Sequence, residues 1–142
     1  MAERIAFVAC ILFFVAGLAT GVWKYVCIRR SKESRAPRYV NVSHTAALFY
    51  SMACLVLLEL VRQSRLCDSV EAWTVSLVVA FFACAFASYI VHGIMADTGN
   101  QLARPHRLGS HVINDRMVTL FMSILICVEL GGVILLFVGA FI

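Results

Sequence analysis

The chain of 142 residues is about the length of one domain. It is 62% hydrophobic and 14% charged, whereas soluble domains have about 45–50% and about 25%, and its mean hydropathy is +0.90. So few charges cannot cover so much apolar surface in water, which excludes a soluble globular domain and a disordered chain. The net charge of +4 lies in segments that flank apolar runs, so we expect no nucleic-acid partner.

Four apolar stretches predict an all-α integral membrane protein, a four-helix bundle that forms one transmembrane domain over residues 1–142. The predicted spans cover residues 5–24, 40–62, 72–96 and 117–141, with long loops at 25–39 and 97–116. Each span can cross a hydrocarbon core of about 30 Å and is too continuous for the alternating strands of a β-barrel. The first span is expected to remain a helix, because it is longer than the apolar region of a signal peptide.

The distribution of lysine and arginine predicts the orientation of the spans. Nine of the 12 Lys and Arg residues lie on the side of the first and third loops, and three lie on the other side. Loops rich in positive charge remain in the cytoplasm. We therefore expect a multi-pass protein of the inner (cytoplasmic) membrane with both termini outside. The short second loop predicts an antiparallel hairpin of the two helices that it joins.

Small residues mark expected helix contacts. Gly17 and Gly21 form a GxxxG motif in the first span, and small residues recur in the third span at Ala80, Ala83, Ala85 and Ala87. Such residues let helices approach closely, so we expect a homo-oligomer in the lipid bilayer. The six cysteines include no CxxC pair, and four of them lie inside spans. We interpret them as packing residues rather than zinc ligands or disulfides.

All four histidines lie on the predicted cytoplasmic side. His44 is about one turn inside the second span and His92 about one turn before the end of the third, so antiparallel helices bring them to similar depth. Helical periodicity adds three polar side chains to a predicted pocket, namely Ser51, Ser88 and Tyr89. An imidazole at this depth can ligate haem or another metal, or it can be a structural group at headgroup level.

Glu129 lies near the middle of the fourth span, where a charged carboxylate costs about 2–3 kcal/mol or more. We expect a neutral carboxylic acid that faces the bundle interior. Its role is interpreted as proton handling or substrate contact, or as a hydrogen bond to a neighbouring helix. In the third loop, Asn114 and Asp115 are predicted to cap the fourth helix, and the length of the loop is typical of a lid.

The segment around His44 is similar to one in a known family. Residues 37–48 read PRYVNVSHTAAL and are followed by Met52. This segment resembles the second span of the styrene oxide isomerase and hydroxylaminobenzene mutase family of small four-span membrane proteins. That helix opens with a histidine, followed by Ala/Gly-Leu and then Met. A second match is Tyr89 with Gly99 and Asn100 ten residues further on, and the span count and loop pattern agree across the chain.

The resemblance implies a homotrimeric isomerase that holds haem b near a subunit interface. His44 would be the axial ligand, and the ferric iron would act as a Lewis acid on the oxygen of a small hydrophobic epoxide or hydroxylamine. Tyr89 falls where the family places a polar residue near the substrate, which makes it the catalytic candidate. Isomerase members carry asparagine six residues after the histidine, whereas this chain has Tyr50, so the substrate and the reaction stay open. Secondary candidates are His92, Tyr50, Asn100 and Glu129.

Two other interpretations are compatible with the same residues. The chain can be a cytochrome b-like or anchoring subunit of a membrane redox complex, with His44 and His92 as paired haem ligands. It can also be a non-catalytic membrane protein in which both histidines are structural.

Overall fold

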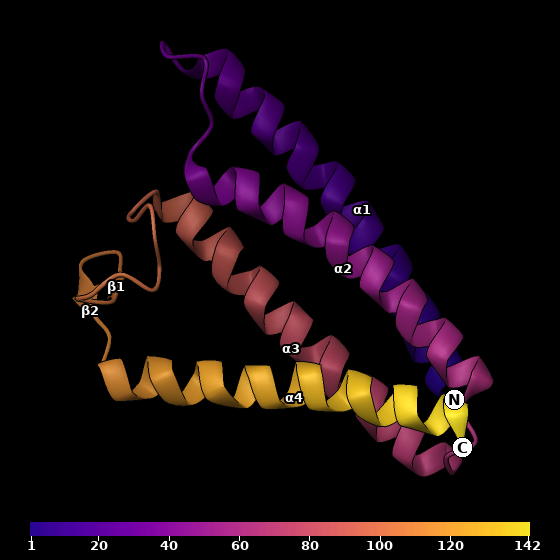
Figure 1. Cartoon of the computed structure of the whole chain (residues 1–142). Helices are drawn as coiled ribbons and strands as arrows, with labels where there is room; N and C mark the ends of the chain where they lie inside the picture. Colours follow the sequence, from indigo (N-terminus) through magenta and orange to yellow (C-terminus); the bar gives the residue numbers. More distant parts are fainter.

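The computed structural model describes residues 1–142 as four long helices and one short hairpin (Figure 1). The helices are α1 (Ala2–Arg30), α2 (Arg38–Gln63), α3 (Asp68–Met95) and α4 (Asp115–Phe141), and the antiparallel hairpin between α3 and α4 consists of β1 (Arg107–Leu108) and β2 (His111–Val112). All four helices are long and apolar enough to cross a membrane. The predicted all-helical class and the number of candidate spans are therefore confirmed.

The helices extend beyond the predicted spans, and the loops are correspondingly shorter. α1 continues past residue 24 to Arg30, because the segment YVCI at 25–28 is apolar enough to prolong the helix. α3 begins at Asp68, and the carboxylates of Asp68 and Glu71 in its first turn complement the positive end of the helix dipole. The connections that remain cover residues 31–37, 64–67 and 96–114.

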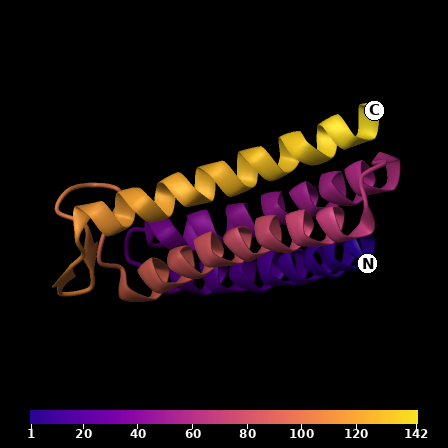
Figure 2. The same cartoon turned by 90° about the horizontal axis from the view of Figure 1, so that it is seen from below.

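The helices meet at one end of the molecule and separate toward the other. Both termini lie at the end where the helices meet, whereas the 31–37 and 96–114 connections lie at the opposite end (Figures 1 and 2). Near the termini, the backbone N–H of Arg65 donates to the carbonyl of Gly139 at 2.9 Å. In α4 only Leu136 and Gly139 are buried, so most of its surface contacts no other part of the chain.

The buried core lies toward the end that carries the termini and is built from side chains of all four helices. Fully buried members include Ala6 in α1, Cys54 in α2, Val78 in α3 and Leu136 in α4. Gly132 of α4 receives the Val78 side chain, and a Cβ at this glycine would overlap it. The close approach of α4 to α3 therefore depends on the missing side chain at position 132.

The GxxxG motif of α1 is used within the chain. A Cβ on Gly17 would collide with the Leu48 side chain of α2, and a Cβ on Gly21 would lie 3.0 Å from Cε1 of His44. The motif thus joins α1 to α2, and α1 and α2 run side by side along their length (Figure 1). Among the small residues of α3, Ala85 is buried and Ala80, Ala83 and Ala87 are exposed.

The predicted cap of α4 is confirmed at Asn114. The side-chain oxygen of Asn114 accepts a hydrogen bond from the backbone N–H of Arg116 at 2.9 Å. Asp115 is the first helical residue rather than the cap. There it complements the helix dipole and accepts an ion pair from Arg104 at 2.9 Å.

Candidate functional site

His44 lies against the glycine motif of α1. Its Nδ1 is 2.8 Å from the carbonyl oxygen of Gly17. A carbonyl oxygen only accepts, so Nδ1 carries the proton and donates it. Nε2 then holds the lone pair, and it makes no hydrogen bond within the chain. This arrangement fixes the tautomer and the ring orientation, as the partners of metal-ligating histidines do.

His92, in the last turn of α3, has a carboxylate partner in the loop that follows the helix. Its Nδ1 is 2.9 Å from Oδ1 of Asp97, and both side chains are 7% exposed. The second oxygen of Asp97 accepts the backbone N–H of Gly109 at 2.5 Å. The pKa of the Asp97 carboxyl lies below its ordinary value. The hydrogen bond from the Gly109 N–H is the main cause, and the hydrogen bond from His92 is the second. The ionised carboxylate therefore ties the end of α3 to the hairpin.

The residues of the polar pocket that helical periodicity predicted lie in two separate groups. On the α1 side, His44 bonds Gly17, and the Ser51 hydroxyl lies 3.5 Å from the sulfur of Cys10. On the side of the third loop, Ser88 donates to the side-chain oxygen of Gln101 at 2.9 Å, and His92 bonds Asp97. His44 and His92 are thus held by different partners, because the rotation of α2 places His44 toward α1.

Tyr89 of α3 packs against α2. Its ring stacks on Tyr39 with centroids 6.1 Å apart, and Tyr39 also packs on His92 at 5.2 Å. The phenol of Tyr89 lies close to the phenol of Tyr50. The Tyr50 ring is stacked on Phe82 at 4.5 Å. Two of the candidate residues, Tyr89 and His92 of α3, therefore share Tyr39 of α2 as a common contact.

Glu129 lacks the hydrogen bond to a neighbouring helix that one interpretation of its role required. Its Oε1 is buried and has no partner in the chain. The space over Gly132, one turn further along α4, is occupied by the Val78 side chain and is not open beside the carboxyl. A buried, unpaired carboxyl oxygen is costly when it is charged. A buried carboxyl oxygen without a partner suits a neutral acid better than a carboxylate.

Glu129→Gln is expected to be nearly silent, because the amide keeps the size and hydrogen-bonding capacity of a neutral carboxyl. Glu129→Ala is expected to lower the melting temperature by several degrees, because it leaves a cavity between α4 and its neighbours. Thermal unfolding of the purified variants checks both results. A large loss of activity in Glu129→Gln with unchanged unfolding would instead assign proton handling to this residue.

The third loop closes over the end of α3 and includes functional candidates that the sequence did not reveal. The Tyr39 hydroxyl accepts the backbone N–H of Gln101 at 2.6 Å. His106 is 6% exposed and bonds Asp115 at 3.0 Å. Asn100 is exposed, and its side chain accepts the N–H of Leu102 at 3.0 Å, which makes it a turn residue. The pairing of Asp97 with His92 could not be predicted from the sequence, since it depends on how the loop folds back.

Acid pH is expected to loosen this loop through Asp97. Because the pKa of Asp97 is lower in the folded than in the unfolded chain, its stabilisation is complete above the ordinary carboxyl pKa of about 3.9. It is lost as the pH falls through the folded value. The melting temperature, measured from about pH 7 to about pH 2, should fall less steeply in Asp97→Asn than in the wild type.

The exposed Glu33, which forms no ion pair, offers the matched control for this pH series. Glu33→Gln should keep the slope of the wild type. If Asp97→Asn followed the wild-type curve as well, the carboxylate would contribute nothing to acid stability.

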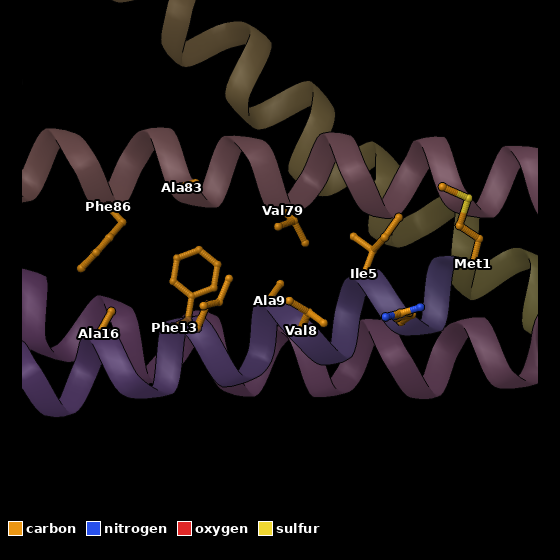
Figure 3. A pocket seen from close by; sticks show the side chains of 11 residues that line it. Met1, Ile5, Val8, Ala9, Phe13, Ala16, Val79, Ala83 and Phe86 are labelled. Atoms are coloured by element: carbon orange, nitrogen blue, oxygen red, sulfur yellow. The ribbon is translucent and has the colours of Figure 1, made fainter.

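The described side chains form no group of three or more His, Cys, Asp or Glu that could hold a metal ion. A porphyrin supplies four ligands of its own, so haem needs only one or two from the protein, and His44 can provide one. The largest cavity, of about 680 Å³, is an apolar groove between α1 and α3 (Figure 3). Arg4 is its only charged lining residue, so this groove offers no catalytic groups.

Comparison with known proteins adds no further assignment. No protein-family model matches the chain, and neither a curated protein nor a solved structure matches it. The function is therefore argued from the residues and contacts described above.

Proposed function

We propose that this chain is a membrane-embedded, haem b-dependent isomerase that rearranges a small hydrophobic epoxide or hydroxylamine. The observation that carries the proposal is the fixed tautomer of His44. Its Nδ1–H is committed to the Gly17 carbonyl at 2.8 Å, so Nε2 is available as an axial ligand. This residue is also the histidine of the segment that resembles the second span of the styrene oxide isomerase family.

His44 would hold the haem iron, and Gly21 makes room for its ring. When bound, ferric haem supplies a Lewis acid that polarises the oxygen of an epoxide or of an N–O bond. Tyr89 is the catalytic candidate, because a neutral phenol donates a hydrogen bond to such an oxygen without ionising. Tyr50, at the position where the isomerases that this segment resembles carry asparagine, is a second candidate donor.

Aromatic side chains would keep water away from the phenols. Phe13 of α1 packs on Tyr50 at 5.5 Å, on Phe82 at 6.5 Å and on Phe86 at 6.1 Å. An apolar surround strengthens the hydrogen bond from a phenol and suppresses competing hydrolysis. An isomerisation consumes no second substrate, so a Lewis acid, a donor and a dry pocket are sufficient for it.

The bilayer is the proposed environment and the source of the substrate. Large apolar side chains are exposed on all four helices, as suits helices that face lipid. Small aromatic epoxides and hydroxylamines partition into lipid and would reach the protein there. The charge asymmetry of the loops supports a topology in the inner membrane with the 31–37 and 96–114 connections in the cytoplasm and both termini outside.

We further propose a homotrimer, as the resemblance implies. The glycine motif of α1 is occupied by α2, so it is not free for contacts between subunits. The surfaces that remain are the uncovered faces of α4 and the exposed alanines at positions 80, 83 and 87 of α3. These surfaces are the candidates for the subunit interface.

The visible spectrum of the purified protein, titrated with ferric haem, tests the proposed function. Saturable binding with a five-coordinate or weakly six-coordinate spectrum is expected, because His44 supplies one ligand and leaves the other iron face open. A low-spin bis-histidine spectrum would favour the cytochrome b-like interpretation. Absence of binding would refute the haem-dependent mechanism. The mass of the complex in native nanodiscs tests the trimer in the same preparation.

The orientation is expected to place Cys67 outside and Cys27 inside. Cys67 is exposed in the connection between α2 and α3, and Cys27 lies near the opposite end of α1. Single-cysteine variants in intact cells should react with a membrane-impermeant maleimide at Cys67 and remain unlabelled at Cys27. The reverse pattern would invert the topology.

A further inference from the structure

A second cavity lies where the third loop meets α3 and α4. It has a volume of about 270 Å³, close to the lower end of the range of about 300–1,000 Å³ for small-molecule sites. Its polar wall includes His92 and Gln101, and its apolar wall is formed by α4 through Val118, Phe121 and Met122. Figures 1 and 2 show α4 separated from α3 at this end, with the loop between them.

The polar wall includes a ring nitrogen that makes no hydrogen bond within the chain. His92 is only 6% exposed, and its Nδ1 is committed to Asp97. His92 and Asp97 both also line a different cavity, together with Pro37 and Thr98. The opposite ring nitrogen, Nε2, makes no hydrogen bond, and the ring lines the cavity beside α4. Because Nδ1 donates to the carboxylate, Nε2 presents an acceptor lone pair.

Gln101 supplies the complementary donor. Its side-chain oxygen accepts the Ser88 hydroxyl at 2.9 Å, whereas its amide N–H groups have no partner. A hydroxyl can therefore donate to His92 Nε2 and accept from the Gln101 amide. Arg107 and His106 also line the cavity, but Arg107 is exposed, and both ring nitrogens of His106 are already bonded, to the Gln101 carbonyl and to Asp115. These groups suit a neutral ligand better than an anion.

We propose that this cavity binds a small neutral amphiphile, a one-ring alcohol or phenol whose hydroxyl donates to His92. The apolar ring of the ligand would pack against Val118, Phe121 and Met122. In the proposed orientation the cavity lies at the cytoplasmic border of the hydrocarbon, where amphiphilic molecules concentrate. The site lies on the α4 side of α3, apart from His44, and it does not depend on haem.

Fluorine NMR titration with 4-fluorophenol tests the site on the full chain in nanodiscs, with empty nanodiscs as the reference for partitioning. Saturable binding is expected for 4-fluorophenol and not for 4-fluoroanisole, which has no donor. His92→Asn keeps an N–H for Asp97 but removes the Nε2 acceptor, so it should weaken binding about tenfold. Val118→Phe fills the cavity from α4 and should abolish saturable binding.

Val138→Phe is the matched control, since Val138 is 49% exposed on the same helix and lines none of the cavities described. It should bind 4-fluorophenol like the wild type. The proposal is overturned if the wild type shows only non-saturable partitioning, if saturable binding survives Val118→Phe, or if a folded His92→Asn binds equally well. If His92→Asn does not fold, the comparison of Val118→Phe with Val138→Phe decides.

Discussion

His44→Ala is expected to lose haem and isomerase activity together. The variant removes the Nε2 ligand, while the Gly17 carbonyl that oriented it remains in α1. If His44 holds haem as proposed, its loss would release the group, and the Lewis acid that would polarise the substrate oxygen would be lost with it. The haem absorbance of the purified variant and its rate of product formation measure the two losses, each expected to exceed about tenfold.

A matched histidine variant separates this effect from a general loss of imidazole. His111 is exposed in the hairpin and makes no side-chain hydrogen bond, so His111→Ala should keep the haem and the rate of the wild type. Added imidazole should restore part of the haem absorbance of a folded His44→Ala variant, because it occupies the vacated ligand position. A His44→Ala variant that behaved like the wild type would refute the mechanism.

Tyr89→Phe should retain haem but lose about one to three orders of magnitude in rate. The substitution keeps the ring that stacks on Tyr39 at 6.1 Å and removes only the hydroxyl. Removal of one donor to a developing oxyanion lowers rates by about this factor in other enzymes. The loss should appear in kcat at saturating substrate, because the donor acts mainly on the transition state.

Tyr25→Phe provides the control for this substitution, since Tyr25 is 62% exposed on α1 and stacks on no other ring. It should keep the wild-type rate. Loss of haem in Tyr89→Phe would make the phenol a structural group, and an unchanged rate would exclude it as the donor. In either case Tyr50, whose phenol lies close to that of Tyr89, becomes the next residue to substitute.

The helical class and the four candidate spans follow from local composition. Continuous apolar runs leave a helix as the spanning structure, because its backbone groups are satisfied within the segment. The cap at Asn114 could also be predicted, since capping depends on residues adjacent in the chain. The ends of the helices were harder to predict, because apolar residues such as those at 25–28 prolong α1 beyond the length that crosses the hydrocarbon core.

The partners of the polar side chains were decided only by the tertiary structure. α1, α3 and α4 are apolar on every side, so hydrophobic periodicity does not determine which face each turns toward its neighbours. The rotation of α2 against the glycines of α1 places His44 on Gly17 rather than beside His92, and the return of the third loop joins His92 to Asp97. Sequence alone determined that these histidines lie near one end of the spans, whereas helix packing and loop closure determined which ring nitrogens remain free to bind a ligand.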